Sequence, residues 1–121
     1  MTRRAWIAAA VGAALLHGRR AHAHAFLERA DPRVGGTLRV APARVRLWFT
    51  ESLESAFSRV EVFASSGERV DRGDVTLDAA DRRLMAVSLA PLAAGPYRVV
   101  WRALSIDSHL TEGDFTFHLK P

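Results

Sequence analysis

The feature that most constrains the fold is a two-residue alternation of apolar and polar side chains. Val45, Leu47 and Phe49, for example, alternate with arginine, tryptophan and threonine. Successive side chains of a strand point to opposite faces of a sheet, so this pattern predicts a strand with one buried face. The sequence after residue 23 sustains no apolar spacing typical of a helix. The alternating segments are residues 44–50, 59–64, 97–103 and 114–120.

Turn-forming residues separate these segments and indicate the fold class. Asp31-Pro32 ends an extended segment at 25–30, and the polar loop 78–83 predicts a hairpin between 75–77 and 84–89. We therefore expect about seven short strands, which is the number and spacing of an immunoglobulin-like β-sandwich or barrel. Residues 24–121 are predicted to form one all-β domain of this class.

The first 23 residues have the composition of a cleavable export signal. Arg3-Arg4 precede an apolar run from Trp6 to Leu16, and the small-residue triplet Ala21-His22-Ala23 follows. The apolar run is shorter than the roughly 20 residues of a transmembrane helix, so we expect no stable membrane insertion. The predicted location is periplasmic or extracytoplasmic, and the paired arginines also fit twin-arginine export.

Removing this signal changes the charge balance. The whole chain has 17 Lys and Arg against 13 Asp and Glu, a net charge of +4. Four of the arginines precede residue 24, which leaves 13 basic and 13 acidic residues. No clustered basic face of the kind that binds nucleic acid is evident in the remainder. The chain also has no cysteine, so packed side chains rather than disulfides must stabilise it.

The position of the cleavage site decides which residue begins the exported chain. Cleavage after Ala23 makes His24 the first residue, and its free α-amine and imidazole can chelate one metal ion. The triplet Ala23-His24-Ala25 also satisfies the small-x-small rule of signal cleavage. Cleavage after Ala25 would discard this histidine.

A second candidate pair follows the strand that contains Trp101. Asp107 and His109 are two residues apart, so an extended backbone would direct both side chains to one side. The alternative is an aspartate that caps a turn beside a solvated histidine. Together with His24 the pair offers an amine, two imidazoles and a carboxylate, which suit Cu(II). Zn(II) would accept the same donors in a tetrahedral arrangement.

The soft ligands of a Cu(I) site are missing. Cu(I) favours thiolate and thioether sulfur, and Met85 is the single methionine after residue 23. Met85 lies within a predicted strand, where packing in the core is its expected role. We therefore expect no site for reduced copper.

Several segments resemble the CopC family of exported copper-binding proteins. The resemblance covers essentially the whole chain after residue 23, and the pattern Trp-Arg-x-x-Ser-x-Asp-x-His is its most specific part. It implies Greek-key connections and one Cu(II) ion per chain, held by the amine and imidazole of His24 with Asp107 and His109. It also favours cleavage before His24. The segments are His24-Ala25-Phe26-Leu27, Leu47 to Leu53, Tyr97 to His109 and Gly113 to Phe117.

The resemblance also suggests secondary features of the site. Glu51 matches a family glutamate beside the N-terminal histidine, where it would support the ligands or occasionally contact the metal. Some family members carry a methionine-rich loop for Cu(I), whereas residues 65–70 of this chain contain no sulfur. A Cu(II)-only protein fits this departure better than a carrier of both oxidation states.

The resemblance implies a protein of copper homeostasis or resistance rather than an enzyme. Such a protein would buffer copper or deliver it to a CopD-type transporter in the inner membrane. One alternative is a histidine-brace copper monooxygenase-like enzyme, although the anionic Asp107 should stabilise Cu(II) and discourage redox cycling. The other alternative is a metal-free secreted immunoglobulin-like adhesion module.

Overall fold

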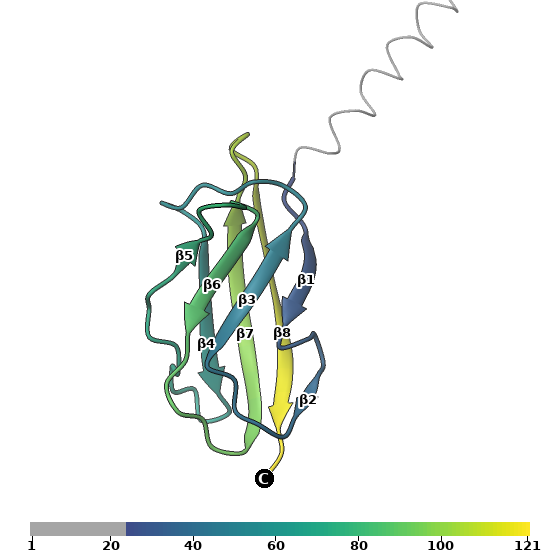
Figure 1. Cartoon of the computed structure of the whole chain (residues 1–121), viewed down its shortest axis with the longest axis vertical. Coiled ribbons are helices and arrows are strands. Elements are labelled where there is room, and N and C mark those ends of the chain that lie inside the picture. Colours follow the sequence, from purple (N-terminus) through teal and green to yellow (C-terminus); the bar gives the residue numbers. More distant parts are fainter. Residues whose placement is uncertain (1–23) are drawn as a thin grey trace, which may run out of the picture.

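Two four-stranded sheets pack face to face in the computed structural model, which describes residues 24–121 (Figure 1). The strand orders are β1-β3-β6-β5 and β2-β8-β7-β4. The predicted export signal, residues 1–23, lies outside the described residues. Within the described part of the chain, no helix is long and apolar enough to cross a membrane. The strands are β1 (Leu27–Asp31), β2 (Thr37–Leu38), β3 (Arg44–Phe49), β4 (Arg59–Ala64), β5 (Thr76–Leu77), β6 (Leu84–Ser88), β7 (Gly95–Leu104) and β8 (Leu110–Leu119).

The connections agree with the predicted all-β sandwich. Only β5–β6 and β7–β8 are both consecutive in sequence and paired within a sheet, and the other pairings skip strands. The pairings are antiparallel except that of β2 with β8, which is parallel. The β5–β6 hairpin is the one predicted from the polar loop 78–83, whereas the short strand β2 was not predicted.

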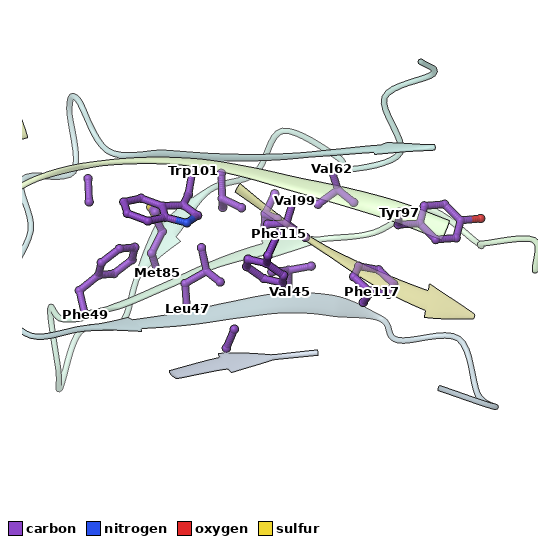
Figure 2. Close-up of a cluster of buried hydrophobic side chains, with 14 of the residues drawn as sticks. Val45, Leu47, Phe49, Val62, Met85, Tyr97, Val99, Trp101, Phe115 and Phe117 are labelled. Atoms are coloured by element: carbon purple, nitrogen blue, oxygen red, sulfur yellow. The ribbon is translucent and has the colours of Figure 1, made fainter. Parts of the chain in front are cut away.

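Alternating residues of the two sheets meet in one apolar core (Figure 2). Val45, Leu47 and Phe49 of β3 are at most 1% exposed, which confirms the inward face predicted for this strand. The ring of Phe49 meets Trp101 of β7 edge to face, with 5.2 Å between ring centroids. Met85 is also completely buried, as expected of a core residue. The sheets are therefore joined by close packing of aliphatic and aromatic side chains.

The β7–β8 hairpin is longer than the sequence pattern predicts. Its register pairs residues continuously from Gly95 with Leu119 to Leu104 with Leu110. The last strand was predicted to begin at Asp114, but residues 110–113 also pair, because β7 supplies backbone partners for them. This extension carries the hairpin to the same end of the sandwich as the start of the described chain (Figure 1).

A buried carboxylate ties the connection after β4 to both sheets. Asp71 accepts hydrogen bonds from the N–H groups of Val62 at 2.8 Å and Gly73 at 3.1 Å, and it forms an ion pair with Arg69 at 2.9 Å. Its backbone bridges to Leu89 of the other sheet. Burial alone would raise the pKa of the Asp71 carboxyl, but the Arg69 guanidinium and the Val62 N–H lower it below its usual value.

Replacing Gly113 should destabilise the domain, because Trp101 lies directly over this glycine. A Cβ at residue 113 would lie 2.5 Å from Cζ2 of the indole, which is a severe overlap. We expect Gly113→Ala to lower the free energy of unfolding by about 1–3 kcal/mol in urea denaturation. The control is Glu112→Ala at the adjacent exposed position, where the change should stay within about 0.5 kcal/mol. Equal stability of both variants would contradict this packing.

Asp71→Asn should reduce stability at neutral pH by about 1.5–3 kcal/mol, because it removes the charge from a hydrogen-bonded buried group. The lowered folded-state pKa means that the stabilisation is complete above the unfolded-state pKa of about 3.9. It is lost as the pH falls through the folded-state value. Urea denaturation at a series of pH values should therefore show wild type and variant converging in acid. Asp81→Asn, in an exposed pair with Arg83, should show a much smaller difference throughout.

Candidate metal centre

His24 and His109 lie side by side at one end of the sandwich, although they come from opposite ends of the domain sequence. Their ring centroids are 4.5 Å apart, with the ring planes inclined by 36°. The His24 residue is half-buried and His109 is exposed. An imidazole nitrogen binds a metal at about 2 Å, so two imidazoles on one ion must approach each other closely. The observed pair fits this requirement.

The segment around His24 is anchored by hydrogen bonds to two strands. The Thr50 hydroxyl, just after β3, accepts from the N–H of Phe26 at 2.9 Å and lies 3.3 Å from the carbonyl oxygen of His24. The Thr50 N–H donates to the Phe26 carbonyl at 2.9 Å. On the other side, the Thr111 hydroxyl of β8 donates to the carbonyl of Ala25 at 2.5 Å. Ala25 itself is completely buried.

His109 is positioned by a tight loop at the tip of the β7–β8 hairpin. The buried Ser105 organises this loop: its N–H donates to the His109 carbonyl at 3.0 Å, and its hydroxyl accepts from the His109 N–H at 3.2 Å. The Ser105 carbonyl also accepts from the N–H of Ser108 at 2.9 Å. Ser108 has a φ of +66°, in the left-handed region that few non-glycine residues adopt. The loop is thus a closed turn.

This turn removes the argument that backbone alternation places the side chains of Asp107 and His109 on the same side. An extended backbone would direct both side chains to one side, but residues 106 and 107 form a turn, as in the alternative interpretation of this segment. Alternation therefore does not place the Asp107 carboxylate, which belongs to an exposed residue. Within residues 24–121, no group of three or more His, Cys, Asp or Glu residues is arranged to hold a metal ion. Asp107 as the third ligand therefore stays a prediction.

Glu51 directly follows Thr50 and is half-buried. In the part of the chain that the structure describes, no hydrogen bond or ion pair joins its carboxylate to His24 or His109. The structure therefore brings together two of the four predicted site residues. Both acids remain candidates: Asp107 is two residues from His109 in sequence, and Glu51 follows Thr50, which bonds to the segment of His24.

Sequence reasoning missed the residues that position the histidines: Thr50, Ser105 and Thr111. The role of Thr111 could have been predicted, because Thr111 lies on the same face of the strand as the buried Phe115 and Phe117. A polar residue at an inward-facing position usually has a hydrogen-bond partner. The prediction that the strand begins at Asp114 left this position outside the pattern.

Comparisons with known proteins agree with this fold. A family model described as the CopC domain matches residues 27–120. The copper transport protein CutJ of Bacillus subtilis (strain 168) is 33% identical over 98 residues, which cover 80% of this chain but only 18% of CutJ. The family match begins after His24, so it does not itself test this histidine.

Two crystal structures have the same sandwich. CopC from Methylosinus trichosporium OB3b is 33% identical, with a TM-score of 0.76, and the match covers 81% of this chain and 95% of that protein. PcoC, a methionine-rich copper resistance protein from Escherichia coli, is 33% identical, with a TM-score of 0.71 and coverage of 81% and 100%. The family match spans nearly all the described residues. This chain therefore belongs to the CopC family, a family of copper resistance proteins rather than of enzymes.

Proposed function

We propose that this protein is an exported Cu(II)-binding protein that buffers copper outside the cytoplasm and delivers it to a CopD-type membrane transporter. The observation that carries the proposal is the contact between His24 and His109, with ring centroids 4.5 Å apart, in a CopC-family domain. The ligands are the amine and imidazole of His24, the imidazole of His109 and the carboxylate of Asp107. Glu51 helps to orient these ligands or occasionally contacts the metal itself.

The proposal requires signal cleavage between Ala23 and His24. The fold supports this position, because Ala25 is completely buried and its carbonyl accepts a hydrogen bond from Thr111. A product that begins at Phe26 would lack Ala25 and leave the Thr111 hydroxyl without that acceptor. Cleavage before His24 instead retains every residue that bonds to Thr50 and Thr111 at this end of the sandwich. The mature protein would then be periplasmic or extracytoplasmic.

The chemistry of the donors supports the oxidised ion. Nitrogen and carboxylate oxygen donors suit Cu(II), whereas Cu(I) prefers thiolate or thioether sulfur. Met85, the single methionine after residue 23, is completely buried in the core and cannot reach a surface site. The comparison protein PcoC is methionine-rich, so this chain differs from it in the element that would hold Cu(I). We infer one Cu(II) ion per chain.

A transport partner is supported by the relationship to CutJ. The segment of CutJ that resembles this chain makes up only 18% of a protein named for copper transport. In that protein a CopC-like segment is therefore covalently joined to a much longer chain. We infer that this separate CopC domain works with a membrane transporter as a second chain, whereas in CutJ the CopC-like segment is part of the longer chain.

His109→Ala should weaken Cu(II) binding by at least about 100-fold, because even residues that only support a ligand change metal affinity by about 10–100-fold. The measurement is a competition titration with a chelator on protein that begins at His24. His118→Ala is the matched control, because His118 is also exposed but pairs with Pro96 at the far end of the β7–β8 hairpin. Equal affinity in the two variants would favour the metal-free adhesion module instead.

A single additional alanine before His24 should lower the Cu(II) affinity strongly, because it converts the chelating amine into an amide. Acidification should also lower the Cu(II) affinity of the protein that begins at His24, since protons compete with the metal for both nitrogens. Both effects can be measured by the same titration, with thermal unfolding of the apo forms as the control for folding. Equally tight binding by the extended protein would exclude the amine as a ligand.

A further inference from the structure

The Thr111 hydroxyl connects the N-terminal segment to the part of the fold that carries His109. Thr111 lies in β8, two residues after His109. Its hydroxyl donates a hydrogen bond to the carbonyl of Ala25, the residue that follows His24. The position of Thr111 is fixed by its pairing with Ala103 in the β7–β8 hairpin. A short path of covalent and hydrogen bonds therefore joins the two imidazole-bearing residues.

Thr50 holds the same segment from the other sheet. Its hydroxyl accepts from the Phe26 N–H at 2.9 Å and is oriented toward the His24 carbonyl at 3.3 Å. Its backbone N–H donates to the Phe26 carbonyl. The segment His24 to Phe26 is thus held between the end of β3 and the start of β8, with Ala25 completely buried between them.

The atoms used by this clamp are not the atoms that would bind copper. The two threonines engage the carbonyl oxygens of His24 and Ala25 and both backbone polar groups of Phe26. The imidazole of His24 and its backbone nitrogen take no part in these bonds. The clamp can therefore fix the backbone of residue 24 without competing for its two donor nitrogens.

We propose that Thr111 and Thr50 are positioning residues that hold His24 beside His109 and so preassemble the metal site. This inference rests on the proposed function, in which His24 is a ligand. Chain termini are usually poorly ordered unless they are tied down. Ordering a residue on binding consumes free energy that a preorganised site retains as affinity.

The test compares Thr111→Val with wild type, both beginning at His24. Valine keeps the shape of threonine but cannot donate to Ala25. We expect Cu(II) affinity to fall about tenfold, the equivalent of ordering roughly one residue. The electron paramagnetic resonance spectrum of the bound Cu(II) should broaden or change, and the amide of Phe26, which donates to Thr50, should lose hydrogen-exchange protection. Thr111→Ser, which restores the hydroxyl, should recover all three properties.

Thr116→Val is the matched control, because it makes the same change on β8 at a half-exposed position. It should leave the affinity, the spectrum and the exchange at Phe26 unchanged. If Thr111→Val does not fold, Thr50→Val and Thr50→Ser provide the same comparison from the other strand. Wild-type affinity and spectrum in a folded valine variant would overturn the proposal.

The outcomes also separate this inference from the proposed function. If His109→Ala binds Cu(II) as tightly as wild type, the proposed site is wrong, and the threonines have no ligand to position. If His109→Ala weakens binding while the folded valine variants do not, the site stands and only the role of the clamp is rejected. If Thr111→Val destabilises the apo domain but leaves the Cu(II) spectrum unchanged, the hydroxyl is structural only.

Discussion

The arrangement of this protein depends on the continuous pairing of β7 with β8. Ten residue pairs hold these two strands together from Gly95 to the loop after Leu104. Along its length the hairpin contributes Trp101 and Phe117 to the core, and the loop at its tip carries His109. Because the strands are rigid along their length, the core fixes the position of the loop that closes them. The candidate site is thus an extension of the most extensively paired part of the fold.

The packing that stabilises the domain and the candidate metal ligands occupy different parts of the sandwich. The core between the sheets and the buried carboxylate of Asp71 hold the domain together without a disulfide. His24 and His109 lie at one end, where the structure uses short polar side chains rather than apolar packing. Ser105 and Thr111 there satisfy backbone groups that would otherwise be buried without partners. This separation allows a ligand to be replaced without opening the core.

The sequence predicted the parts of the structure that depend on side-chain periodicity. The inward faces of β3 and β7 followed from alternation, because burying one face of a sheet fixes which residues point inward. The early start of β8 at Leu110 did not follow, because residues 110–113 lack a clean apolar alternation and are recognised as a strand only through their pairing with β7. A turn at Asp107 was the alternative to an extended segment, and the sequence did not decide between the two. The left-handed residue of this loop is Ser108 rather than a glycine, so residue type alone does not mark that position.

The contact between His24 and His109 shows what a single sequence can and cannot contribute. Residue types suggested both histidines as ligands, but only the fold reveals that Thr50 and Thr111 secure the segment His24 to Phe26. These bonds use carbonyl and amide groups that are the same before and after cleavage at Ala23. With the proposed cleavage, the nitrogen of His24 changes from an amide to an amine while its surroundings need not rearrange. Copper binding would then depend on a chemical change at one atom rather than on a conformational change.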